Sequence, residues 1–214
     1  MEKNISKSVI RRLPRYYRFL EELLNEGVEK ISSSQLAERM RSTASQIRQD
    51  LNCFGGFGQQ GYGYNVAELR AEIGAILHLD GKRKVILVGA GNLGRAIAAH
   101  IDFPQYGCEL IGIFDRDRQL LGLNIAGLRI CSTNALSDFC REYKPDMAVL
   151  CIPREGAEDT VKLLVESGVN AFWNFSHYDI QGDFPNAAVE NVHLTDSLMT
   201  LSYSMSDIAH PLKT

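Results

Sequence analysis

The segment 84-KVILVGAGNLGRAIAAHI-101 decides the fold. Its apolar run from Val85 to Val88 predicts a buried strand, and the residues from Asn92 to Ile101 predict a helix. Between them stands Gly89-Ala90-Gly91-Asn92-Leu93-Gly94, a G-x-G-x-x-G pattern. In this context the first glycine permits a tight turn, the second lets a pyrophosphate approach the backbone, and the third allows close helix packing. The segment therefore predicts a dinucleotide site, with glycines that serve packing alone as the alternative.

Asp115 lies 24 residues beyond Gly91, at the end of the next expected strand (109–114). A carboxylate there accepts hydrogen bonds from ribose hydroxyls and repels the 2′-phosphate of NADP, which favours NAD. Arg116 and Arg118 keep NADP open, because a nearby arginine accommodates a phosphate.

Strands and helices continue to alternate after this strand. We expect helices at 134–143 and 157–166 and strands at 147–152 and 171–175, which together predict an α/β doubly wound parallel sheet of the Rossmann type. A final helix, 194–205, carries an apolar stripe that needs a partner surface in this subunit or another. The expected nucleotide-binding domain spans 81–190, and the C-terminal helix region spans 191–214.

The first 65 residues predict a winged helix-turn-helix. Apolar spacing indicates a helix at 13–26 with Pro14 in its first turn, and a short second helix follows Ser32 or Ser33 as its cap. Thr43 and Gln46 have the form of a capping box that opens a third helix, ending near residue 53. The glycine- and aromatic-rich segment 54-FGGFGQQGYGY-64 predicts a two-stranded wing, with a flexible linker as the alternative. A helix at 66–77, within an expected linker of 66–80, would bridge to the next domain.

Charge and cysteine content narrow the class of protein. Residues 1–65 hold 10 Lys/Arg and 7 Asp/Glu, a net charge of +3, whereas residues 66–214 hold 13 and 19, a net charge of −6. A basic head suits a polyanion partner, although a chance clustering of surface charge gives the same modest value. The 5 cysteines include no C-x-x-C pair, so we expect reduced thiols in a cytoplasmic protein, with neither a disulfide framework nor a metal site. No stretch has the form of a secretory signal or a membrane span.

From Arg12 to Tyr203 the chain resembles the bacterial redox-sensing repressors of the Rex family. The motifs that carry the resemblance are RLPRYYRFL (12–20), ISS (31–33), IRQDLNCFGGFGQQGYGYNV (47–66), GAGNLGRA (89–96), FD (114–115) and NF (174–175). The resemblance implies a homodimer with exchanged terminal helices. It also implies binding to palindromic operator DNA, which NADH releases.

The resemblance also implies roles for matched positions. The DNA-contacting candidates are Arg11, Arg12, Arg15, Tyr17, Ser45, Gln46, Arg48, Gln49, Phe57, Gln59, Gln60, Tyr62 and Tyr64, and Arg18 belongs to the same basic cluster. The family usually has Lys where this chain has Gln49, so one positive charge is missing. Many relatives have Tyr and Asp at the positions of His100 and His193, a pair linked to the subunit switch. We expect either a rewired, pH-sensitive contact or two tolerated substitutions.

NADH and NAD+ share their phosphates and riboses, so only the nicotinamide distinguishes them. Apolar residues at strand ends would favour the neutral reduced ring over the cationic oxidised ring. The candidates for contact with the dinucleotide are Gly89, Ala90, Gly91, Asn92, Leu93, Gly94, Asp115, Ile152, Pro153 and Phe175.

Two other functions stay open. An NAD-dependent oxidoreductase would need a catalytic acid or base, for which only His177 and His193 are available, and each is more often an ordinary polar residue. An adaptor would use the helix-turn-helix to bind protein. We expect a repressor without enzymatic activity.

Overall fold

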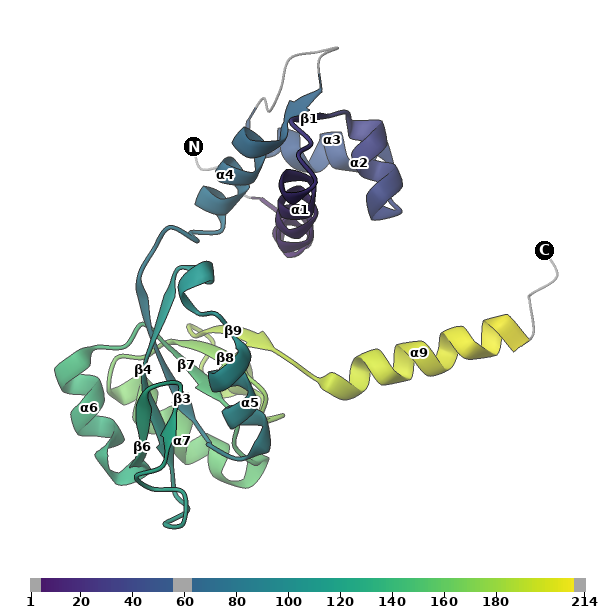
Figure 1. Cartoon of the computed structure of the whole chain (residues 1–214). Helices are drawn as coiled ribbons and strands as arrows, with labels where there is room; N and C mark the ends of the chain where they lie inside the picture. The colour runs from purple at the N-terminus through teal and green to yellow at the C-terminus, as the bar shows by residue number, and fades with distance from the viewer. Residues whose placement is uncertain (1–4, 56–62, 210–214) are drawn as a thin grey trace. The chain divides into compact units, whose positions relative to one another are not determined.

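The computed structural model describes residues 5–55 and 63–209, and the chain divides into two compact units, Met1–Gly81 and Lys82–Thr214 (Figure 1). The first unit contains α1 (Lys7–Asn25), β1 (Lys30–Ile31), α2 (Ser33–Met40), α3 (Ala44–Asn52), β2 (Tyr64–Asn65) and α4 (Val66–Ile76). All four helices contribute to one hydrophobic core, which includes Leu20, Leu36, Ile47 and Ile73. The helix expected to bridge the domains is therefore part of the N-terminal core.

Local capping sets the helix boundaries in this unit. Ser6 caps α1, so the helix begins one and a half turns before the predicted start, and the prediction of Pro14 in the first turn is wrong. Ser32 and Gln35 form a full capping box on α2. For α3 only half of the predicted box is present, because Thr43 accepts from the backbone of Gln46 while the Gln46 side chain bonds to Asp50.

A two-stranded antiparallel sheet joins residues that lie far apart in the chain. Ile31 of β1 is paired with Tyr64 of β2, and Lys30 is paired with Asn65. The predicted wing strands fall largely on residues 56–62, which lie outside the described residues.

The second unit is built on a seven-stranded sheet. Its strands are β3 (Arg83–Val88), β4 (Cys108–Asp115), β5 (Asn124–Ile125), β6 (Leu128–Ser132), β7 (Met147–Leu150), β8 (Ala171–Asn174) and β9 (Ala188–Asn191). The order is β5-β6-β4-β3-β7-β8-β9, and every pairing except β5 with β6 is parallel. The six parallel strands follow the doubly wound order 3-2-1-4-5-6, which places a switch point beside β3.

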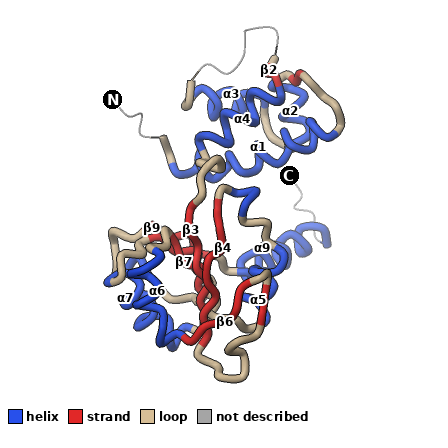
Figure 2. The backbone as a smooth tube through the Cα atoms, turned by 60° about the vertical axis from the view of Figure 1, so that its left-hand side comes forward, coloured by secondary structure: helices blue, strands red, loops and turns tan. Residues whose placement is uncertain are grey.

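Helices cover both faces of this sheet (Figure 2). They are α5 (Asn92–His100), α6 (Leu136–Tyr143), α7 (Ala157–Glu166) and the short α8 (Ile180–Asp183), with 3-10 turns at Pro104–Tyr106, Thr133–Ala135 and Arg154–Gly156. Successive side chains of β3 point to opposite faces. Val85 and Leu87 pack in the cluster with α5, whereas Ile86 and Val88 pack in the cluster with α6 and α7. Burial on both faces explains the continuous apolar run in the sequence.

The last helix, α9 (Leu194–Ala209), presents a strongly apolar surface to solvent. Its large apolar side chains are 56% to 66% exposed: Leu194, Leu198, Met199, Leu201, Tyr203 and Met205. Within the described residues, no helix has the length and apolar character needed to cross a membrane.

Candidate nucleotide site and nucleic-acid interface

Close packing requires glycine at two positions of the turn that follows β3. Gly89 has a φ of +98°, and a Cβ there would lie 2.4 Å from the carbonyl oxygen of Cys151. A Cβ on Gly94 would lie 1.8 Å from the carbonyl oxygen of Gly89, so no larger residue fits. Around Gly91, in contrast, a Cβ would meet nothing within 4 Å. Packing therefore accounts for Gly89 and Gly94, and it leaves the space at Gly91 free for a ligand that approaches the backbone.

Asp115 holds this turn from the end of β4. One carboxylate oxygen accepts from the backbone N–H of Ala90 at 2.5 Å, and the other accepts from that of Asp117 at 2.8 Å. The residue is only 9% exposed. Because each carboxylate oxygen has a second lone pair, Asp115 can still accept from ribose hydroxyls.

A cavity of about 470 Å³ opens beside this turn, at the carboxyl ends of the strands. It lies beside the neighbouring strands β3 and β7, whose following connections run in opposite directions to β4 and β8, and this is the place at which open α/β sheets bind their ligands. Its lining residues are Val88, Gly89, Gly91, Asp115, Arg116, Thr133, Cys151, Ile152, Pro153, Gly156, Asp159 and Thr160.

The other predicted ligand contacts are not among these lining residues. Ala90 and Gly94 are buried in the turn, Leu93 is exposed, and the Asn92 side chain accepts from Arg95 at 2.8 Å. Phe175 is not among the lining residues and packs against the ring of Trp173, with 5.1 Å between centroids. Sequence reasoning missed Thr133, Asp159 and Thr160 in the lining. Their positions in the sequence could have identified them. Thr133 begins the 3-10 turn after β6, and Asp159 and Thr160 lie in the first turn of α7, the helix that follows β7.

The N-terminal unit presents one face of α3. Ser45, Arg48 and Gln49 are exposed there, as a recognition helix requires. Arg48 also donates to the hydroxyl of Ser33 at 2.9 Å, which ties this guanidinium to the start of α2.

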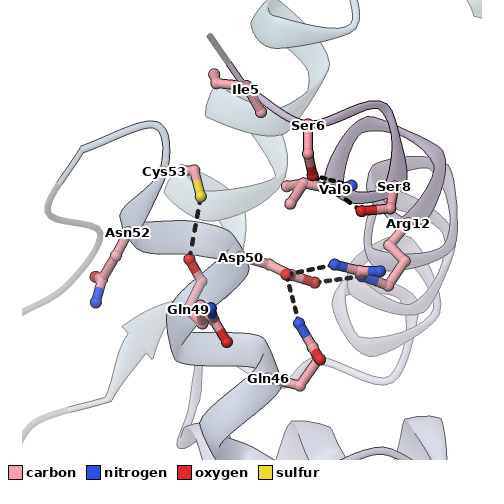
Figure 3. A pocket seen from close by; sticks show the side chains of 10 residues that line it. All are labelled: Ile5, Ser6, Ser8, Val9, Arg12, Gln46, Gln49, Asp50, Asn52 and Cys53. Atoms are coloured by element: carbon pink, nitrogen blue, oxygen red, sulfur yellow. Dashed lines mark hydrogen bonds and ion pairs between the residues drawn. The ribbon is translucent and has the colours of Figure 1, made fainter. Parts of the chain in front are cut away.

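Asp50 links α3 to α1 through hydrogen bonds to its buried carboxylate (Figure 3). Its carboxylate is fully buried and accepts from Arg12 through Nε at 2.6 Å and Nη2 at 2.7 Å. The Tyr16 hydroxyl and the Gln46 amide each donate to it at 2.7 Å. Arg12 and Gln46, both expected to contact DNA, therefore have structural partners. Arg12, Gln46 and Asp50 border a hollow of about 720 Å³ between the start of α1 and α3.

The ionisation of Asp50 reflects two opposed effects. Burial by itself would raise its pKa, but the hydrogen bonds from Arg12, Tyr16 and Gln46 outweigh burial, and the pKa lies below its ordinary value. Burial first, and the bond to Asp50 second, raise the pKa of Tyr16. The carboxylate is thus charged at neutral pH.

Two expected DNA contacts need correction. Tyr17 is 8% exposed, with the Arg70 guanidinium 4.4 Å from its ring centre, and Tyr64 is 9% exposed where β2 pairs with β1. Both rings belong to the hydrophobic core, because apolar burial outweighs their polar tips.

The remaining candidates are divided between described and undescribed residues. Arg11 and Arg18 are exposed on α1, while Arg15 donates to the carbonyl of Met40. Phe57, Gln59, Gln60 and Tyr62 lie outside the described residues.

His100 and His193 occupy different settings. His100 ends α5 as an exposed side chain, whereas Nδ1 of His193 lies within hydrogen-bonding distance of Nδ1 of His177. In the described part of the chain, no group of three or more His, Cys, Asp or Glu side chains is placed to hold a metal. Burial raises the pKa of the Cys151 thiol to about 12 and that of Cys140 to about 11, so both thiols are protonated at neutral pH.

Comparison with known families supports both units. Residues 4–52 match the family described as "Putative DNA-binding protein N-terminus", and residues 80–178 match the family described as "CoA binding domain". Along nearly its whole length, the chain is 49% identical to the redox-sensing transcriptional repressor Rex of Clostridioides difficile (strain 630), covering 96% of this chain and 97% of that protein. The chain belongs to the Rex family of redox-sensing transcriptional repressors. A second Rex repressor, from Thermoanaerobacter sp. (strain X514), is 50% identical over 95% of this chain and 90% of that protein.

Solved structures of the Rex family share this architecture. The crystal structure of RSP in complex with β-NAD+ and operator DNA has a TM-score of 0.88 and 48% identity, covering 96% of this chain and 94% of that one. RSP in complex with β-NADH has a TM-score of 0.89 and 46% identity, covering 98% and 99%. The expected fold class is therefore confirmed.

Proposed function

We propose that this chain binds palindromic operator DNA through the exposed face of α3 and that NADH, bound in the cavity beside Gly91, releases it. The observation that carries the proposal is the coexistence in one chain of a helix-turn-helix and a dinucleotide turn whose middle glycine faces open space. Rex-family relatives are named as repressors, and RSP has been solved with operator DNA, NAD+ and NADH.

The cavity suits NAD(H) better than the coenzyme in the name of the matching family. Coenzyme A and NADP both carry a phosphate on the adenosine ribose, which a buried carboxylate repels. Asp115 lies in the lining with both oxygens fixed by backbone N–H groups, so it cannot turn away without losing those bonds. Arg116 in the same lining is the feature that would favour a phosphate.

We propose that the dinucleotide is a signal and not a reactant. Among the described residues that line the cavity, none is His, Lys or Tyr, the usual proton donors of hydride-transfer enzymes. Ile152 and Pro153 give the wall an apolar stretch that would favour the neutral nicotinamide of NADH. A preference of ~10³ over NAD+ requires only about 4 kcal/mol.

Assembly and location complete the proposal. A homodimer in the cytoplasm, with residues 191–214 exchanged between subunits, would cover the exposed apolar face of α9 and match a palindrome. We propose that residues 1–65 bind DNA, that residues 66–80 connect the two functions and that residues 81–190 bind NAD(H).

Fluorescence anisotropy with labelled DNA tests the function. Duplexes selected from a random palindromic library are titrated with the protein, and NADH or NAD+ is then added separately. We expect specific binding that NADH abolishes and NAD+ leaves nearly intact. A Gly91→Val control should bind DNA normally but resist NADH. Binding that responds to neither nucleotide would contradict the sensor, turnover of a hydroxy substrate would favour an oxidoreductase, and no salt-dependent DNA binding would favour an adaptor.

A further inference from the structure

Two histidines meet at the base of α9. His177 follows β8, and His193 immediately precedes the first residue of α9. Their Nδ1 atoms are 2.7 Å apart, and the rings meet edge to edge, with centroids 4.8 Å apart and an interplanar angle of 19°. A hydrogen bond at this distance requires that one Nδ1 carries a proton and the other does not.

The side chain of Asn174 holds the two segments that carry this histidine pair (His177 and His193) in place. Asn174, fully buried at the end of β8, donates through Nδ2 to the carbonyl of Tyr178 at 2.9 Å and to Oδ1 of Asn191 at 2.8 Å. Its own Oδ1 accepts from the backbone and hydroxyl of Ser176. One side chain thus fixes both the loop that carries His177 and the end of β9, two residues before His193.

His177 itself adopts a backbone conformation that needs such support. Its φ is +59°, in the left-handed region that non-glycine residues seldom occupy. The loop bonds around it offset this strain, so the imidazole is directed by the fold.

The ionisable groups of the neighbouring elements are a neutral tyrosine and several carboxylates. Tyr178 and Asp179 lie on the loop, Asp183 on α8, Glu190 on β9 and Asp196 in the first turn of α9. Tyr178 donates to Asp183, and Asp179 accepts from the backbone of Gly182. The sequence has no Lys or Arg between Lys162 and Lys213.

One added proton and two added protons have opposite effects on the contact. With one imidazolium, the bond becomes a charge-assisted N–H···N bond and strengthens. With two, both Nδ1 atoms carry hydrogen and both rings are cationic, so the contact must open. The second protonation therefore breaks the contact between the rings, and formation of the contact makes the second protonation less favourable.

We propose that the histidine pair is a proton-gated latch, which fixes the start of α9 to the nucleotide-binding unit while it shares one proton and releases it when both rings are protonated. This goes beyond binding of DNA and NADH, because it makes the anchoring of α9 a function of pH. The local reporters are the backbone N–H of Val192, which bonds to the Asn174 carbonyl, and that of Asp196, which bonds to the His193 carbonyl.

Titration of the histidine ring nitrogens by NMR tests the latch in the full chain. We expect His177 and His193 to titrate in two coupled steps separated by at least about one pH unit, a tenfold difference in proton affinity. In His177→Gln and in His193→Gln the remaining ring should titrate in one step. Independent, single-step titration of both rings in the wild type overturns the proposal.

Hydrogen exchange of residues 192–196 supplies the second readout. His177→Phe keeps an aromatic ring but removes the bond and the second charge, and comparison at equal pH cancels the intrinsic pH dependence of exchange. The wild type should exchange at least about threefold more slowly than His177→Phe at pH 7.5 and equally fast at pH 5. A ratio that does not change between these pH values contradicts the latch, and normal NADH binding by the variant confirms that it is folded.

Discussion

At the scale of single residues, Asp50 and Asp115 are both buried carboxylates, and each needs hydrogen-bond donors in place of water. Asp50 is satisfied by side chains from α1 and α3, and Asp115 by two backbone N–H groups. A buried charge without partners would cost several kcal/mol, so both sites depend on complete hydrogen bonding.

Replacing Asp50 should destabilise the N-terminal unit and remove one source of acid sensitivity. The pKa of Asp50 is depressed in the folded state, so its contribution is present above the unfolded value, near 4, and is lost as pH falls through the folded pKa. We expect Asp50→Asn to lower the free energy of unfolding by about 2 kcal/mol at pH 7 and to flatten its decline below pH 4. Urea unfolding followed by circular dichroism from pH 7 to pH 2.5 measures both.

Tyr16→Phe is the matched control for Asp50→Asn, because it removes one donor and leaves the charge pair intact. Its expected cost is about 1 kcal/mol, with the acid sensitivity retained. Equal pH profiles for the wild type and Asp50→Asn would contradict the assignment.

Substitutions at two glycines of the same turn should have different effects, one on stability and one on NADH binding. A Cβ on Gly94 overlaps a backbone oxygen, whereas one on Gly91 meets no neighbour. We expect Gly94→Ala to lower the thermal stability of the nucleotide-binding unit by several degrees, and Gly91→Val to leave stability unchanged while weakening NADH binding at least tenfold. Differential scanning calorimetry and isothermal titration with NADH separate these outcomes, and full NADH affinity in Gly91→Val would refute the role given to Gly91.

At the scale of elements, α3 combines an inner face that is fixed with an outer face that is free. Ile47, Asp50 and Leu51 are buried, while Ser45, Arg48 and Gln49 are exposed. The bonds of Asp50 to α1 thus orient the outer face. Arg12 and Gln46 take part in this fixed side through Asp50, and their contact with DNA stays a prediction.

Gln49→Lys should strengthen DNA binding through charge. The added cation would release one more counterion from each recognition helix that contacts the duplex. It would thereby steepen the salt dependence by about 0.9 in log K against log salt per helix. Anisotropy titrations at several salt concentrations measure the slope, with Gln119→Lys, at an exposed position of the nucleotide-binding unit, as a control for charge outside α3. An unchanged slope would show that Gln49 does not approach phosphate.

At the scale of the whole molecule, the exposed apolar face of α9 is the feature that a single chain leaves uncovered. Six large apolar side chains on one helix exceed what scattered surface residues require, and such a face normally marks an interaction surface. The proposed palindromic operator has two half-sites, so the cover that we propose for this face is a second subunit.

A double substitution in α9 should therefore change the oligomeric state. We expect Leu198→Lys with Leu201→Lys to convert a dimer into monomers and to weaken operator binding by at least about a hundredfold, since two linked half-sites become one. Sedimentation velocity gives the mass, and Leu123→Lys, at another exposed apolar position, should remain dimeric. A dimeric double variant would rule out α9 as the main contact.

The sequence alone determined the features that depend on local pattern. The apolar run before Gly89 predicted the central strand, and the glycine spacing predicted the turn. A capping pattern predicted α3, the alternation of strands and helices predicted α5 and α7, and an apolar stripe predicted α9. It missed β5, β6, β9 and α8, which are short, polar or exposed, and which exist because a neighbouring strand or loop completes their hydrogen bonds.

Only the tertiary structure decided which side chains share a partner. Asp50 is 38 residues from Arg12, and His193 is 16 residues from His177, distances at which sequence periodicity carries no signal. Burial likewise moved Tyr17 and Tyr64 from the expected interface into the core. Local spacing fixes backbone conformation through steric and hydrogen-bonding preferences, whereas long-range contacts depend on how the assembled elements pack.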